Sequence, residues 1–198
     1  MVIVVAVIFG LAKMGNTAST TTVDQQVLLE GARFIKTNGE TKVSVVIFSD
    51  IQCPSCKRAK EMLKELETTP GVNYVVRHFP LPANVHKYSL ISAKAVEAGR
   101  VMGKGWEMMN IMFEKQEEWS GVSKPEVSFV EYSKSLGLDG KIFEETMNSK
   151  EVAELVQTDA SLASRLQLSG TPTIYVNGEQ VGVDFVVSKV KDLLARTQ

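Results

Sequence analysis

Cysteine and histidine are both scarce in this chain, which has two of each among 198 residues. Both cysteines, Cys53 and Cys56, fall in one C-x-x-C sequence, so no further cysteine remains for a framework of structural disulfides. A zinc finger would need two histidines about three to five residues apart, about 12–15 residues beyond the cysteines. His78 and His86 have neither spacing. We therefore expect no metal site and no cofactor, and we expect both histidines to be structural.

An excess of charge of one sign is also lacking. The 22 Lys and Arg residues nearly balance the 23 Asp and Glu residues, and they are scattered along the chain, so no nucleic-acid partner is expected. With 44% hydrophobic and 23% charged residues, the composition is that of a globular protein. A chain of this length buries roughly 70% of the surface of its unfolded form, which is enough to fold without a structural disulfide.

The chain begins with an apolar run that is too short to cross a bilayer alone. Residues 1–12 (MVIVVAVIFGLA) would span about 18 Å as a helix, against a hydrocarbon core of about 30 Å. The run fits the core of a signal peptide, although the usual basic residues before it are absent and Lys13 follows it. A start upstream of Met1 would explain that absence, and a buried first strand is the alternative. We predict a signal or membrane-anchor segment and linker over 1–22, and a folded domain over 23–198.

The period of the hydrophobic pattern changes along the folded part. A β-branched run over 41–49 predicts a buried strand, a helical period begins at Pro54, and residues 72–79 predict a second strand. Two such strands joined by a helix should be parallel. Asn-Gly between two later apolar runs predicts a hairpin. The other expected elements are a weak helix over 25–34, a helical insertion of about 84–168 broken at 103–105, 121–125 and 137–140, strands over 173–176 and 180–183, and a closing helix over 185–196. The predicted fold class is α/β, with βαβ, a helical insertion and then ββα.

The C-x-x-C sequence lies where the first strand ends and the helix begins. Free N–H groups and about half a positive charge at a helix start stabilise an anion, so Cys53 should ionise more readily than an ordinary thiol. Pro54 suits the first helical position, where its missing N–H is not needed. Cys56 lies one turn further in and should be less exposed. We therefore predict that Cys53 attacks disulfides and that Cys56 resolves the mixed disulfide.

Three segments together resemble the DsbA-like proteins, in particular the secreted or membrane-anchored bacterial and archaeal branch of thioredoxin type. They are FSDIQCPSC at 48–56, VVRHFPLP at 75–82 and SGTPTIYVNGEQVGV at 169–183. The resemblance covers about 43–194. It implies a thioredoxin fold with a helical insertion, which is the order of elements that the periodicity predicts.

The resemblance also implies roles outside the cysteine pair. Thr171-Pro172 is similar to the cis-proline loop that faces the cysteines and pairs with the substrate backbone, although a proline that merely starts a strand fits the residues equally well. Asp50 is similar to the acidic residue before the active site, which could tune the site electrostatically or cap or orient the loop. Ser55, the second residue of the active-site dipeptide, stands where the most oxidising members have histidine. A hydroxyl brings no positive charge, so this pair should be less oxidising.

These features predict an extracytoplasmic thiol–disulfide oxidoreductase, specifically a dithiol oxidase that passes its disulfide to cysteine-containing exported proteins. The resemblance implies a quinone-linked membrane oxidase as the partner that regenerates the disulfide. A reductase or isomerase in the same compartment is the alternative, but isomerases of this kind are usually dimers, and the chain is expected to be a monomer. A thiol-based carrier of copper(I) is a third interpretation. Aromatic and methionine side chains over 106–113 are expected to pack the insertion, or in part to bind peptide.

Overall fold

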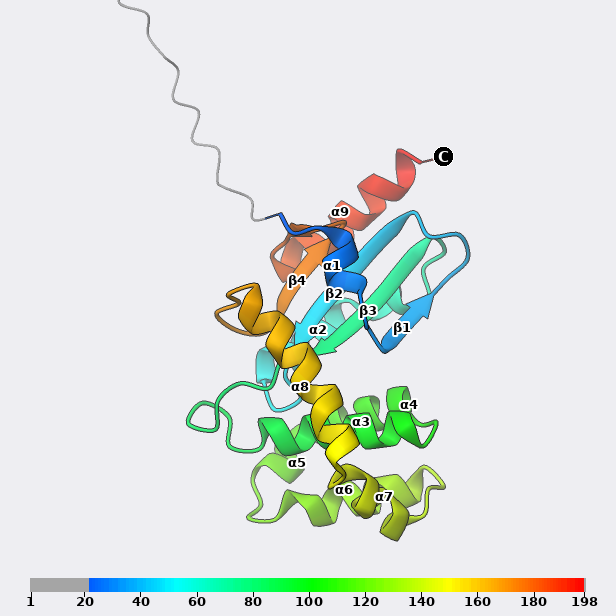
Figure 1. Cartoon of the computed structure of the whole chain (residues 1–198). Coiled ribbons are helices and arrows are strands. Elements are labelled where there is room, and N and C mark those ends of the chain that lie inside the picture. The colour runs from blue at the N-terminus through cyan, green and yellow to red at the C-terminus, as the bar shows by residue number, and fades with distance from the viewer. Residues whose placement is uncertain (1–21, 198) are drawn as a thin grey trace, which may run out of the picture.

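The computed structural model describes residues 22–197, which form a five-stranded sheet with helices on both faces (Figure 1). The strands lie in the order β1-β3-β2-β4-β5, with β2 and β3 parallel and the other neighbours antiparallel. The bounds are Phe34–Thr37 (β1), Val43–Ser49 (β2), Val72–His78 (β3), Thr173–Val176 (β4) and Glu179–Gln180 (β5). The predicted α/β fold, with parallel central strands and a helical insertion, is confirmed.

Strand β2 lies in the middle of the sheet, and its alternate side chains pack into two separate hydrophobic clusters, one on each face. Val45 and Ile47 belong to the larger hydrophobic cluster, and Val46 and Phe48 belong to a smaller cluster on the other face. Every residue of β2 and β3 is buried, as expected for Val- and Ile-rich strands that are covered on both sides.

Helices cover both of these faces. α2 (Pro54–Met62) and α9 (Val183–Ala195) contribute to the larger cluster, and α1 (Gln25–Leu29) and the end of α8 (Lys150–Arg165) contribute to the smaller one. The remaining insertion helices gather at the end of the sheet where β2 and β3 finish (Figure 1). They are α3 (Ser89–Val101), α4 (Gly105–Glu114), α5 (Gln116–Ser120), α6 (Pro125–Ser135) and α7 (Gly140–Met147).

The predicted breaks in the insertion coincide with the observed gaps between helices, and two further breaks were not predicted. Lys115 separates α4 from α5, and 148–149 separates α7 from α8. Neither place contains glycine or proline, so the sequence has no strong helix-breaking residue there. The helix that begins at Pro54 also ends earlier than the Pro70-Gly71 stop, and a 3-10 turn over Lys64–Glu67 follows it.

The expectation of a weak helix over 25–34 is wrong in its second half. α1 ends at Leu29, Gly31 adopts a φ of +66°, and β1 begins at Phe34. β1 pairs antiparallel with β3, with Phe34 opposite Val76. Four residues are too short a run for a period of two to stand out, so this edge strand depends on its tertiary pairing.

The C-terminal hairpin forms, but its second strand is shorter than predicted. Asn177 and Gly178 both have positive φ, at +47° and +85°, as a two-residue hairpin turn requires. The predicted strand over 180–183 is wrong, since β5 contains only Glu179–Gln180. α9 then begins at Val183, two residues earlier than expected.

A buried ionic cluster joins the insertion to the sheet. Arg77 of β3 donates to Asp159 of α8 at 2.7 Å, and Arg33 donates to Asp159 at 3.1 Å and to Glu97 of α3 at 3.0 Å. His78 Nε2 lies 3.3 Å from a Glu97 carboxylate oxygen. His78 is 1% exposed and lies within this cluster, which is a structural position.

The predicted signal or anchor segment lies outside the described residues, apart from Thr22, which forms an isolated β-bridge with Glu179. Among residues 22–197, no helix combines the length and the apolar character needed to cross a bilayer.

Candidate active site

The cysteine pair lies at the junction of β2 and α2. Cys53 is the N-cap residue of α2, with extended backbone angles (φ −75°, ψ 120°), and Pro54 occupies the first helical position. The Cys53 carbonyl oxygen accepts hydrogen bonds from the N–H groups of Cys56 at 3.0 Å and Lys57 at 3.2 Å. This cap geometry sets the Cys53 side chain beside the first-turn N–H groups, which have no partner within the helix.

The two thiols have opposite acidities. Both are free and buried, with Cys53 5% and Cys56 2% exposed. A hydrogen bond from the Cys56 thiol, aided by Thr171 and the N–H groups of Cys56 and Ser55, outweighs burial and lowers the pKa of Cys53 from 9.0 to about 5. Burial, together with the neighbouring Cys53, raises the pKa of Cys56. At neutral pH Cys53 is therefore the thiolate, and Cys56 is the thiol that donates a hydrogen bond to it.

The loop before β4 meets the cysteines from a distant part of the chain. β4 runs antiparallel to β2, with Thr173 opposite Phe48, so the start of β4 lies at the end of β2 that carries the pair. The Thr171–Pro172 peptide bond is cis, and Cys53 Sγ lies 3.6 Å from the Thr171 carbonyl oxygen. Thr171 Oγ1 is buried and makes no conventional hydrogen bond with the described residues, but it lowers the pKa of the thiol.

We expect Thr171→Val to raise the pKa of Cys53 by up to about one unit, because valine keeps the shape of threonine and removes the hydroxyl group that helps to lower this pKa. Ultraviolet absorbance of the thiolate, followed across pH, measures this change. Thr173→Val is the control, since the Thr173 hydroxyl donates to the Gly170 carbonyl at 2.7 Å instead. Equal pKa values in the two variants would show that the Thr171 hydroxyl does not act on the thiolate.

Asp50 is a buried residue that organises the active-site loop. Its Oδ1 accepts the N–H of Gln52 at 2.8 Å, and its Oδ2 lies 2.5 Å from Ser89 Oγ and 2.8 Å from His86 Nδ1. The backbone N–H of Asp50 also lies 3.4 Å from Cys56 Sγ. Of the roles considered for Asp50, orienting the loop is the one that these contacts support. His86, which was expected to be structural, is one of the partners that hold it.

Two residues beside the pair were not predicted. Arg58 donates to Ser55 Oγ at 3.0 Å, which places a guanidinium at a position where the sequence suggested no positive charge. Its spacing of three residues on a helix could have indicated this contact. Gln116 of α5 donates to the carbonyl oxygens of Ile51 at 2.7 Å and Cys53 at 3.1 Å. Gln116 is 63 residues from Cys53, so no local pattern reveals it.

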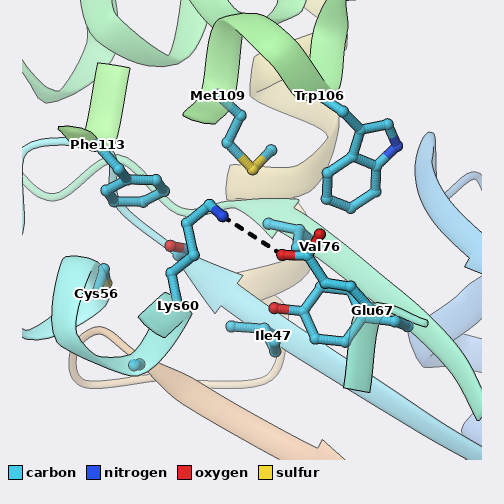
Figure 2. A pocket seen from close by; sticks show the side chains of 11 residues that line it. Ile47, Cys56, Lys60, Glu67, Val76, Trp106, Met109 and Phe113 are labelled. Atoms are coloured by element: carbon cyan, nitrogen blue, oxygen red, sulfur yellow. Dashed lines mark hydrogen bonds and ion pairs between the residues drawn. The ribbon is translucent and has the colours of Figure 1, made fainter. Parts of the chain in front are cut away.

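A small cavity lies behind Cys56, with a volume of about 10 Å³, close to the space that one water molecule needs (Figure 2). Lys60 Nζ lies 3.4 Å from Glu67 Oε1, and Lys36 donates to Glu67 Oε2 at 2.5 Å. Burial raises the pKa of Glu67, but the hydrogen bond from Lys36 and the charge of Lys60 outweigh it and lower that pKa. The other lining residues include Ile47, Tyr74, Val76, Trp106, Met109 and Phe113.

Within 22–197, no three His, Cys, Asp or Glu side chains are grouped to hold a metal ion.

Comparison with known sequences gives a family match and a set of longer relatives. The family described as Thioredoxin matches residues 36–195. A Na(+)/H(+) antiporter, NhaA 3 of Salinispora tropica, is 34% identical over 142 residues, which are 71% of this chain and 21% of that protein. An NhaA 1 antiporter of Mycolicibacterium vanbaalenii is 34% identical over 140 residues, again 21% of its length. The chain thus spans about a fifth of the curated relatives it matches, and the antiporter name refers to those whole proteins.

Solved structures share the fold over most of this chain. Oxidised BdbD from Bacillus subtilis has a TM-score of 0.71 at 22% identity, over 83% of this chain and 94% of that one. A thioredoxin-like oxidoreductase from Silicibacter pomeroyi has a TM-score of 0.70 at 26% identity, over 88% of this chain and 98% of that one. DsbA from Xylella fastidiosa has a TM-score of 0.63 at 22% identity, over 79% and 86%.

Proposed function

Because this chain belongs to the thioredoxin family, as a DsbA-like thiol–disulfide oxidoreductase, we propose that it acts outside the cytoplasm as a dithiol oxidase. It passes a Cys53–Cys56 disulfide to cysteine-containing exported proteins. The single observation that carries this proposal is the contrast between a Cys53 thiol whose pKa is lowered to about 5 and a buried Cys56 thiol whose pKa is raised.

The low pKa of Cys53 favours the oxidising direction. A thiolate that the folded protein stabilises makes the reduced form more stable, so the disulfide becomes easier to reduce and is a better oxidant. Because the pKa of Cys53 in the folded protein lies below its ordinary value of 9.0, this stabilisation is fully present above about pH 9. It declines as the pH falls and is lost below about pH 5. At neutral pH much of it remains.

The exchange proceeds in two displacements at sulfur. A client thiolate attacks Cys53 Sγ of the disulfide, the client–Cys53 bond forms, and Cys56 leaves with the electron pair of the broken bond. A second client thiolate then attacks the client sulfur of the mixed disulfide and displaces Cys53 as a stabilised thiolate. The client gains a disulfide, the protein becomes a dithiol, and two electrons pass from client to protein.

Cys56 needs a proton when it leaves, because burial disfavours its anion. The cavity behind it offers the means, since Cys56, Lys60 and Glu67 all line the same space. Lys60 lies one helical turn beyond Cys56 and lines the same cavity, so we propose that its ammonium stabilises a negative charge that develops on the Cys56 sulfur. In the reverse direction, when Cys56 must attack the mixed disulfide, the same group favours loss of the proton.

A likeness in fold supports the proposed location, and the direction of the reaction implies a partner. A periplasmic thioredoxin-like protein from Salmonella enterica shares the fold, with a TM-score of 0.64 at 20% identity, which supports work outside the cytoplasm. A dithiol oxidase needs an electron acceptor to regain its disulfide, and a quinone-linked membrane oxidase is the partner we propose. We further propose that the protein acts as a monomer, attached to the membrane or exported through residues 1–22.

The reduction potential of the pair tests the proposal. We expect a value between about −270 mV and about −120 mV, the potentials of thioredoxin and DsbA, because Cys53 is stabilised without a histidine in the dipeptide. The measurement is equilibration with glutathione buffers, approached from both the oxidised and the reduced protein. Rapid oxidation of a reduced, unfolded secreted protein should accompany this value. A potential at or below that of thioredoxin would instead assign the protein as a reductase.

A further inference from the structure

We propose that Gln116, from helix α5 of the insertion, is a positioning residue for the Cys53 thiolate. It holds the two carbonyl groups that fix the start of α2, and it thereby couples the insertion to the reactivity of the pair. The inference rests on the proposed thiol chemistry but does not depend on whether the protein oxidises or reduces its clients.

The contact of Gln116 with the active-site loop is direct and buried. Gln116 is 3% exposed, and its Nε2 donates to the Ile51 carbonyl oxygen at 2.7 Å and to the Cys53 carbonyl oxygen at 3.1 Å. An amide nitrogen has two hydrogens, so each carbonyl receives one of them. Ile51 and Cys53 are 1% and 5% exposed, so the amide replaces solvent at the Ile51 carbonyl oxygen and adds a donor to the Cys53 carbonyl oxygen, which also accepts the N–H groups of Cys56 and Lys57.

These carbonyl groups belong to the loop whose backbone conformation sets the direction of the Cys53 side chain. Cys53 is the N-cap residue, and its Sγ reaches the N–H groups of Ser55 and Cys56 only while the loop keeps its extended conformation. The loop makes a tight turn here, since the Cys53 N–H donates to the Asp50 carbonyl at 3.1 Å. Without the Gln116 amide, the buried Ile51 carbonyl oxygen would lose its donor and the Cys53 carbonyl oxygen would keep only its two helical donors, so the loop would have to rotate the Ile51 carbonyl toward water. That rotation would move Sγ away from the first-turn N–H groups.

The insertion holds Gln116 rigidly in turn. Trp119 lies on the same short helix and is completely buried, its indole N–H donates to the Met112 carbonyl at 2.7 Å, and its ring meets Phe129 edge to face at 5.2 Å between centroids. α5 is thus fixed to α4 and α6 by packing. A displacement of the insertion, such as one caused by a client pressing on it, would be transmitted to the cap of α2 through Gln116.

The neighbouring residue on α5 provides a matched control. Glu117 also contacts α2, through a salt bridge of 2.8 Å to Lys57, but its side chain is 77% exposed. Exposed pairs of this kind contribute little, so removing the Glu117 charge should leave the cap of α2 unchanged. The two residues differ in burial and in what they hold, while they share the helix and the target.

The test compares Gln116→Leu and Gln116→Glu with Glu117→Gln in the full chain, reduced and without client. Thiolate absorbance against pH gives the pKa of Cys53, and alkylation by iodoacetamide gives its reactivity. Leucine cannot donate, and an ionised glutamate turns two donors into acceptors with little change in size. We expect both Gln116 variants to raise the pKa of Cys53 from about 5 by about one unit, which lowers the thiolate fraction and slows alkylation about fivefold at pH 5. Glu117→Gln should match the unaltered protein.

A purely structural role for Gln116 gives a different pattern. In that case the Gln116 variants would unfold at lower urea concentration, yet the pKa and the alkylation rate of Cys53 would equal those of the Glu117→Gln control, and the proposal would be overturned. Gln116→Glu keeps the size of the side chain, so it remains informative if Gln116→Leu does not fold. A separate failure of the oxidase assignment would appear in the reduction potential of the unaltered protein and not in this comparison.

Discussion

A Cys56→Ser variant is expected to accumulate mixed disulfides with client proteins, whereas Cys53→Ser accumulates none. Cys53 has a pKa of about 5 in the unaltered protein, so its thiolate is present at neutral pH; it attacks a client disulfide, forms a bond with one client sulfur and displaces the other as a thiolate. Release of that bond by the protein itself needs a second thiol one helical turn away, which serine cannot replace. With a client that has no second free thiol, the trapped species should persist until a reductant is added, and non-reducing electrophoresis after acid quenching measures it.

The assignment of roles fails if the two variants trap clients equally or if Cys53→Ser is the one that traps. Alkylation separates the remaining possibilities. In the reduced Cys56→Ser variant Cys53 should still react at neutral pH, although its pKa should rise because the Cys56 thiol is the main group that lowers it. In Cys53→Ser the remaining Cys56 is buried and its pKa is raised, so it should react slowly.

The largest expected effect on stability comes from Asp159→Ala. Asp159 is 1% exposed and accepts hydrogen bonds from Arg77 at 2.7 Å, from Arg33 at 3.1 Å and from the backbone N–H of His78 at 3.1 Å. Removing one partner of a buried ion pair leaves charge without compensation, which costs about 3–5 kcal/mol of unfolding free energy. Arg77 is 1% exposed and loses its carboxylate partner, whereas Arg33 keeps Glu97, so a loss within that range is expected, as measured by urea unfolding of the reduced protein.

Glu131→Ala is the control for this measurement. Glu131 pairs with Lys134 at 2.8 Å, but their side chains are 63% and 53% exposed, so the change should cost about 0–1 kcal/mol. A loss in Asp159→Ala no greater than that of the control would show that the cluster between sheet and insertion is solvated and does not hold the two parts together.

Local sequence patterns were enough to predict most of the fold and the position of the cysteine pair. The β-branched run of β2, the proline after Cys53 and the Asn177-Gly178 turn each act through the backbone of their own neighbourhood, and the structure agrees with what they indicated. The cis geometry of the bond before Pro172 was expected only from a family resemblance, since the surrounding residues fit a trans bond as well.

What the sequence did not reveal is decided by contacts between distant segments. β1 depends on the pairing of Phe34 with Val76 across the sheet, and its first residue is the last of the run over 25–34 that was expected to be weakly helical. In the sequence, nothing distinguishes Gln116 from other polar residues of an amphipathic helix, because its contact with the Cys53 carbonyl is made only in the folded protein. Periodicity describes which way a side chain faces within its own element, and it contains no information about which backbone group it meets.

The distance along the chain between Cys53 and Thr171 has a consequence for biosynthesis. The contact between them joins residues 118 positions apart, so it cannot form until Thr171 has been synthesised. At about 5–20 residues per second, on the order of ten seconds separate the synthesis of the two residues. Throughout that interval the nascent chain contains both cysteines without the threonine that helps to ionise the first. Until Thr171 has been added, the chain therefore lacks one of the groups that lower the pKa of Cys53, and the pair gains its full reactivity only afterwards.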